Sequence, residues 1–288
     1  MLTLCYRNLL LYFRNKSEVF FSLLAALISF ILYVAFLKDS VGGDWGKELA
    51  HTHFLDLWLI GGTLGTTAIS TTLAAMSQKI EDQEKNTGND FLLSGINHFQ
   101  LSFSYVLSAS LIGFVMQVVV YVVMYLYFYL VDGLRIGLTK SLLLIVLMML
   151  GSLINAIVNA VILLFVQNRN TLSAVSSVIG TVSGFLVGAY IPVGILPQFA
   201  QFLVKLTPGA YVSSLYRQSL LNDNLKNLFP IFSKRAIFSE EMGISLKWNH
   251  LLSYFQTLAI TIVLFVLLLG LLVGIEKIIS TRKNRLEA

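Results

Sequence analysis

Long apolar runs separated by short polar segments dominate this chain. Six runs are long enough to cross a membrane, because a helix needs about 20 apolar residues to span the hydrocarbon core. The third is longer than one upright span requires, so we expect it to tilt or to project beyond the bilayer. The pattern predicts an all-α polytopic membrane protein in which residues 1–288 form a single transmembrane domain. The six runs cover residues 19–37, 54–76, 102–131, 141–165, 171–190 and 250–275.

The N-terminal arm, residues 1–17, has helical periodicity. Thr3, Arg7 and Arg14 fall near one face, with Asn8 beside them, and apolar residues fall opposite. This pattern predicts an amphipathic helix lying in the inner membrane interface. A cytoplasmic extension of the first span is the alternative. No small-residue cleavage site follows the first run, so we expect it to be retained.

Residues 191–249 contain apolar sequence but no full span. The longest apolar stretch, residues 195–206, is too short to cross a bilayer. Pro192, Pro197 and Pro208 interrupt any continuous helix. We therefore expect an extracellular re-entrant or interfacial hairpin followed by a loop.

Basic residues flank the chain at both ends. The positive-inside rule places such clusters in the cytoplasm. Six spans satisfy this rule, with residues 77–100 inside and residues 191–249 outside. We expect a multi-pass protein of the cell (plasma) membrane with both termini cytoplasmic. The basic residues are Arg7, Arg14 and Lys16 in the arm, and Lys277, Arg282, Lys283 and Arg285 in the tail.

Composition excludes an ordinary soluble domain. Hydrophobic residues make up 56% of the chain, and only 12% are charged, against about 25% in soluble domains. The net charge of +5 is spread over several loops, so it predicts no nucleic-acid surface. A single cysteine, Cys5, excludes a disulfide within the chain.

The segment "QKIEDQEKNTGNDFLLSG", residues 78–95, is unusually charged for this chain. A short helix with an acidic end and an apolar face is suited to docking against a partner. A solvated loop is the alternative, because most charge runs are simply hydrated. The candidate contact residues are Glu81, Asp82, Glu84, Lys85, Gly88, Phe91 and Leu92.

This segment resembles the cytoplasmic loop between the second and third spans in permeases of type-2 (ABC-2) ABC exporters. Glu84 and Gly88 match the pattern, whereas Lys85 replaces the usual Arg and Asn89 the usual Thr. Residues 184–217 are also similar to that family, in which a Gly-rich span precedes a Pro-containing hairpin and a Pro-x-x-Tyr motif. The residues that carry this second similarity are Gly184, Pro192, Pro197, Pro208 and Tyr211.

The resemblance implies a transport subunit and not an enzyme. It implies that residues 77–100 form a coupling helix on a cytoplasmic ATP-binding subunit, which holds ATP and magnesium. It also implies a second permease copy, identical or related, and an extracellular gate at Pro192, Pro197, Pro208 and Tyr211. The chain itself contains no G-x-x-x-x-G-K-[ST] phosphate loop, so no cofactor is expected in it.

Small and polar residues within the runs are candidates for packing or for a pathway. Gly180, Gly184 and Gly188 repeat every four residues, which permits close helix approach within one subunit, across a dimer or along a pathway. Thr63, Thr67 and Ser70 share one face, as do Asn155 and Asn159. Polar residues at membrane depth line a cavity or bond between helices.

Two other classes of function remain as alternatives. An intramembrane enzyme or scaffold would need no ATPase. An ion-coupled secondary transporter usually buries ionisable residues, and none lies deep within the six runs. Their absence favours an amphipathic or hydrophobic cargo, such as a drug, antimicrobial peptide, toxin or lipid-like molecule. His51 and His53, with Asp44 and Asp56, fit no strong zinc pattern, so no metal site is predicted.

Overall fold

The computed structural model describes the backbone of residues 1–37 and 53–286, and the side chains of residues 1–35 and 53–277. Within these ranges every regular element is a helix, apart from an isolated bridge between Lys247 and Leu251. The all-α prediction is therefore confirmed for the described part of the chain.

The N-terminal arm forms α1 (Leu2–Arg14), as its periodicity predicts. The Asn15 side chain accepts a hydrogen bond from the Glu18 amide and starts a new helix, α2 (Lys16–Ser22). A bend of 43° separates α2 from α3 (Leu24–Leu32), which ends in a π-helical turn (Tyr33–Leu37). Together α2 and α3 pass as one broken span by length and composition.

Four further helices are long and apolar enough to cross a membrane. They are α6 (Phe54–Glu84), α8 (His98–Asp132), α9 (Leu138–Leu163) and α14 (Tyr254–Leu286), the last counted over Tyr254–Lys277. With the bent pair the described residues contain up to five candidate spans, so the predicted six are not all recovered. The predicted span 171–190 corresponds to α10 (Arg169–Leu186), which is not among the helices that qualify as candidate spans.

The predicted cytoplasmic loop 77–100 is mostly helical. The second span continues to Glu84, so the acidic residues lie on the last turns of α6 and not on a separate short helix. The short helix, α7 (Thr87–Leu93), follows them. A capping box between Asn97 and Gln100 then starts α8.

Residues 191–249 were predicted as a hairpin and loop, but they hold four helical elements. The prolines do prevent one continuous helix, as predicted. Pro192 precedes the 3-10 turn Val193–Ile195, Pro197 precedes α11 (Gln198–Leu206), and Pro208 is the first residue of the next helix, α12. However, α12 (Pro208–Leu228) is a long helix buried along residues 209–221, and α13 (Phe232–Glu241) follows it. The apolar pattern did not predict α12, because this helix carries no apolar run that hydropathy would detect, and the hairpin itself stays a prediction.

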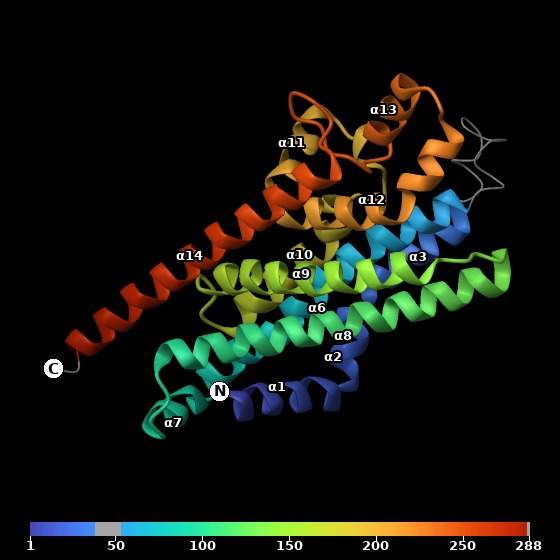
Figure 1. Cartoon of the computed structure of the whole chain (residues 1–288). Helices are drawn as coiled ribbons and strands as arrows, with labels where there is room; N and C mark the ends of the chain where they lie inside the picture. The colour runs from blue at the N-terminus through green and yellow to red at the C-terminus, as the bar shows by residue number, and fades with distance from the viewer. Residues whose placement is uncertain (38–52, 287–288) are drawn as a thin grey trace.

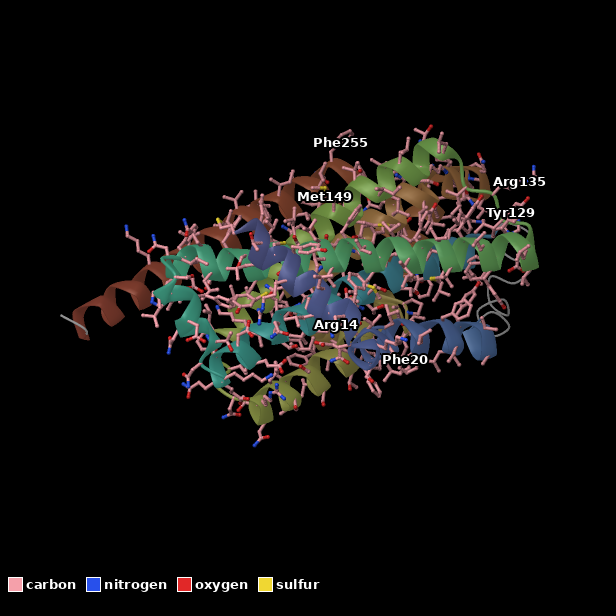
Figure 2. All side chains as sticks on the ribbon, turned by 90° about the horizontal axis from the view of Figure 1, so that it is seen from below. Arg14, Phe20, Tyr129, Arg135, Met149 and Phe255 are labelled. Carbon is pink, nitrogen blue, oxygen red and sulfur yellow. The ribbon has the colours of Figure 1, made fainter. Side chains whose placement is uncertain are left out.

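Helix α6 forms the centre of the bundle, with α8, α9 and α12 packed around it. Outward-pointing apolar side chains cover the periphery, including Phe20, Met149 and Phe255 (Figure 2). The N-terminus, α7 and the C-terminal end of α14 lie toward one end of the bundle, whereas α13 lies at the other (Figure 1). The arrangement gives the protein one end that carries α7 and both described chain ends.

Candidate functional site

Asp82 lies in a buried polar cluster that joins α1, α6 and α8. Arg7 donates to both carboxylate oxygens of Asp82, at 2.7 and 2.9 Å. The Tyr105 hydroxyl donates at 2.5 Å and the Gln78 amide at 2.9 Å. The hydrogen bond to Asp82 raises the pKa of the Arg7 guanidinium above its ordinary value. Asp82 is only 2% exposed, so it holds this chain together and is not available to a partner, contrary to the sequence prediction.

The other charged residues at the end of α6 tie it to the segment that starts α10. Glu84 accepts a hydrogen bond from the Arg169 backbone amide at 2.6 Å and forms an ion pair with its guanidinium at 3.2 Å. Arg169 also pairs with Glu81, which accepts from Lys85 at 2.8 Å. These residues remain partly or fully exposed. The acidic end of α6 is thus held to the start of α10 by a hydrogen bond and ion pairs, while these charged side chains stay accessible to solvent.

Helix α7 projects from this end with no buried residue. The Phe91 ring lies under the Arg7 guanidinium at 5.1 Å, and Gly88 and Leu92 are partly exposed. The next residue, Leu93, is 87% exposed. Leu93 was not among the predicted contact residues, although it directly continues the apolar pair Phe91 and Leu92. The structure therefore presents an apolar residue at the tip of α7.

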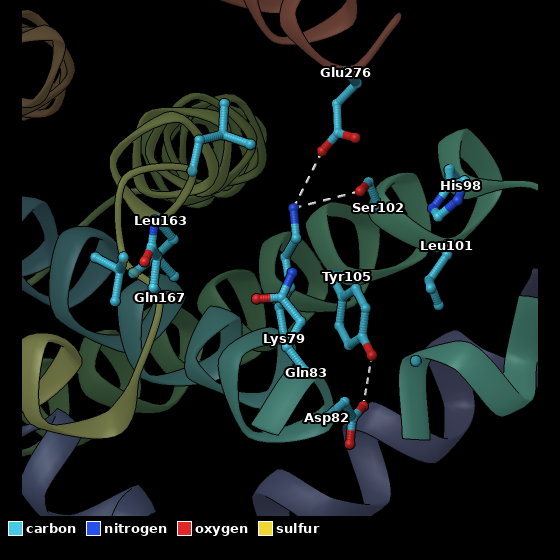
Figure 3. Close-up of a pocket in the computed structure, with 13 residues that line it drawn as sticks. Lys79, Asp82, Gln83, His98, Leu101, Ser102, Tyr105, Leu163, Gln167 and Glu276 are labelled. Carbon is cyan, nitrogen blue, oxygen red and sulfur yellow. Dashed lines mark hydrogen bonds and ion pairs between the residues drawn. The ribbon is translucent and has the colours of Figure 1, made fainter. Parts of the chain in front are cut away.

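A cavity with several polar lining residues lies beside the Asp82 cluster, between α6, α8 and α14 (Figure 3). Its volume is about 330 Å³. Lys79 on α6 pairs with Glu276 on α14 at 3.1 Å, and both side chains are nearly buried. This ion pair was not predicted, because the two residues are 197 positions apart. It connects the last helix to the helix that carries the acidic end.

The hydroxyl face of α6 lies beneath α3. Thr63 and Thr67 are buried, and Thr67 donates to the Thr63 carbonyl. Ser70 is half-buried and lines a cavity of about 510 Å³ between α2–α3 and α10. The three residues thus do not form one continuous open wall within this chain, and only Ser70 reaches this cavity.

The asparagines of α9 form hydrogen bonds inside the bundle. Asn159 donates to the Ile69 carbonyl and to the Thr72 hydroxyl of α6, at 3.0 and 2.8 Å. Asn155 donates to the Gly151 carbonyl of its own helix. Both are buried. In this structure they bond within and between helices, which is the alternative that sequence analysis left open.

Helix α10 keeps a small and polar face exposed. Apart from its chain neighbours and the backbone of its own helix, no atom of the described residues lies within 4 Å of the position that a Cβ on Gly180 would take. Ser177 and Thr181 line the 510 Å³ cavity beside it, opposite Tyr190. Gly184 instead packs against the Tyr190 ring, and Gly188 has a left-handed φ of +65° just beyond the helix. The predicted glycine repeat is therefore not a helix-packing motif within this subunit.

Close helix approaches lie elsewhere, and one of them is between α9 and α12. A Cβ on Gly151 would collide with the Tyr216 hydroxyl and lie 2.7 Å from Val212. We expect Gly151→Ala to lower the free energy of unfolding by about 1–3 kcal/mol, as overpacking does. Gly270→Ala is the matched control, since nothing lies within 4 Å there. Equal unfolding curves for the two variants in detergent would contradict this packing.

The predicted outer-gate residues lie at or near the starts of three helical elements. Tyr211 is buried, donates to the Lys205 carbonyl at 2.8 Å and accepts from the Trp248 indole at 3.1 Å. The three prolines mark the boundaries of the helical elements described above. Tyr211 thus fastens α11 to α12 and to the segment before α14.

Arg217 on α12 is a buried cation that sequence analysis missed. Its guanidinium donates to three backbone carbonyls, of Trp58, Gly188 and Gly243, at 3.3, 2.7 and 3.3 Å. It also lies over the Trp58 ring at 4.4 Å. Arg217 is 1% exposed. One side chain therefore joins α6, the end of α10 and the turn after α13.

The described residues contain no group of three His, Cys, Asp or Glu side chains placed to hold a metal ion. His53 lies 3.7 Å from Asp56, which accepts a hydrogen bond from Tyr33 at 2.6 Å. His51 and Asp44 lie outside the described residues.

Comparison with known families supports the resemblance found in the sequence. The family model for the ABC-2 type transporter matches residues 1–221, which is most of the chain. Comparison with curated proteins gave no match.

Proposed function

Because this chain belongs to the ABC-2 type transporter family, we propose that it is the membrane subunit of an ATP-driven exporter. Separate ATP-binding subunits would hold ATP and magnesium in the cytoplasm and drive the cycle. The observation that carries the proposal is α7, a short helix without buried residues, at the end of the bundle where both described chain ends lie. A coupling element has to be exposed there to meet a cytoplasmic partner.

The same proposal assigns a topology. We count α2–α3, α6, α8, α9, α10 and α14 as six spans, with both termini in the cytoplasm of the cell membrane. Helix α10 is the polar member of this set. Helix α1 would lie in the inner interface, since Leu2 and Tyr6 are exposed on the face turned away from the bundle. The prolines and Tyr211 would shape an outer gate.

A second permease copy would complete the pathway at α10. A polar helix face is costly in lipid, and α10 exposes hydroxyl groups beside Gly180. We infer that the partner copy and the cargo cover this face, with Ser70 at the edge of the pathway. The uncharged lining of that cavity suits an amphipathic or hydrophobic cargo.

Leu93→Asp tests the coupling proposal. We expect the variant to lose most co-purification with the ATP-binding subunit and most transport-linked ATP hydrolysis, because a charge would replace the exposed leucine at the contact. Pull-down and ATPase assays on the co-expressed complex measure this. Leu93 is a cleaner target than Glu84, because Glu84 also binds Arg169.

Phe232→Asp is the matched control, since Phe232 is 74% exposed on α13 at the other end of the bundle. It should retain the ATP-binding subunit. Wild-type binding and hydrolysis in Leu93→Asp would refute the coupling role of α7. A chain that transports without any ATPase would favour a secondary transporter, and one that neither transports nor binds an ATPase would favour an intramembrane enzyme or scaffold.

A further inference from the structure

An apolar groove lies between α3 and α8, away from the α10 cavity. Helix α3 rests on α6 and α10, which leaves a space of about 300 Å³ on its α8 side. Leu27 of α3 and Val120 and Val123 of α8 lie along it. The Phe30 and Tyr127 rings also line the groove and meet edge to face at 5.0 Å. Its volume falls at the lower end of ligand pockets, which span roughly 300–1,000 Å³.

Thr63 of α6 and Tyr127 of α8 are the hydroxyl-bearing residues that line this groove, and neither exposes its oxygen to it in the observed conformer. Thr63 is the one that lies at the bottom of the groove on the central helix. It is 1% exposed, and its hydroxyl has no hydrogen-bond partner among the described residues. Neighbouring hydroxyls on α6 behave differently: Thr67 and Thr71 each donate to the carbonyl four residues earlier. A buried polar group without a partner is costly, so this exception points to a ligand. Threonine occupies two rotamers in helices. Rotation about χ1 exchanges the positions of the methyl and hydroxyl groups, so the Thr63 hydroxyl can turn toward a ligand in the groove.

We propose that this groove binds a neutral single-chain amphiphile that enters from the bilayer. Its alkyl chain lies between α3 and α8, and its hydroxyl or carbonyl oxygen forms a hydrogen bond with Thr63. The chemistry follows from the lining: no charged side chain borders the groove among the described residues, which disfavours an ionic head group. The entry route follows from the walls, because both helices belong to candidate spans. The inference stands whether or not the groove belongs to a transport pathway.

Photolabelling of the full chain in lipid nanodiscs tests this site. The probes are octanol and octane, each bearing a diazirine on the chain, with unlabelled octanol as competitor. We expect octanol-displaceable labelling of residues 23–30 and 119–127, located by mass spectrometry. Thr63→Val keeps the shape and removes the hydroxyl, so half-displacement should need about three to ten times more octanol, the effect of one hydrogen bond. Labelling by the octane probe should not change.

Two further variants keep the result interpretable. Thr67→Val lies on the same helix face, but the Thr67 hydroxyl already has a partner, so octanol displacement should match the wild type. Val120→Phe fills the groove and should abolish labelling by both probes without loss of thermal stability. Labelling that octanol does not displace, as expected if phospholipid chains merely cover the groove, would overturn the proposal. Equal octanol displacement in Thr63→Val and the wild type would also overturn it.

Discussion

Arg217→Met is expected to lower the free energy of unfolding by about 2–6 kcal/mol, because two buried carbonyls would be left without a donor. Methionine fills similar volume but donates no hydrogen bond. The carbonyls of Gly188 and Gly243 lie outside helices and would lose the donor that Arg217 supplies, at about 1–3 kcal/mol for each unsatisfied group. Unfolding of the purified chain by a denaturing detergent measures the loss.

Two controls separate the guanidinium from general effects on α12. Lys226→Met removes an exposed cation from the same helix and should leave unfolding unchanged. Arg217→Lys keeps the charge but loses the planar fork that reaches three carbonyls, so it should fall between the wild type and Arg217→Met. If Arg217→Met unfolds like the wild type, Arg217 does not hold the three segments together.

Helix positions followed from the sequence wherever burial in lipid sets the pattern. Helices α6, α8, α9 and α14 each coincide with a predicted apolar run. The prolines at 192, 197 and 208 separate the helical elements as expected, because a proline ring removes a backbone donor and fixes φ. Local chemistry alone decides these features, so one sequence suffices to predict them.

Features that depend on packing between distant segments escaped prediction. Helix α12 has almost no apolar excess, and its burial arises because α6, α9 and α14 surround it. Arg217 gives no local sign that its partners lie on three separate elements. Asp82 lies in a highly charged stretch of sequence that is typical of a protein surface, yet Arg7 and Tyr105 enclose its side chain. A charge count cannot distinguish such a residue from its exposed neighbours.

Asp82→Ala is expected to release α1 from the bundle. The substitution removes both acceptors of Arg7 and the acceptor of the Tyr105 hydroxyl, and a hydrogen bond to a charged group contributes about 1.5–3 kcal/mol. Cys5 on α1 is the single cysteine of the chain and is buried, so its thiol reports whether α1 is docked. Its labelling by a water-soluble maleimide should accelerate at least about tenfold, the factor that 1.4 kcal/mol produces.

Asp90→Ala is the matched control, because Asp90 is an exposed acid on α7. Its removal should leave the labelling rate of Cys5 unchanged, which distinguishes loss of the buried cluster from a general loss of negative charge at this end. The labelling rate of Cys5 in Asp82→Asn should fall between the rates in Asp82→Ala and Asp90→Ala, since the amide retains one acceptor oxygen but carries no charge. A wild-type labelling rate in Asp82→Ala would show that the apolar contacts of α1 with α8 hold the arm without the cluster.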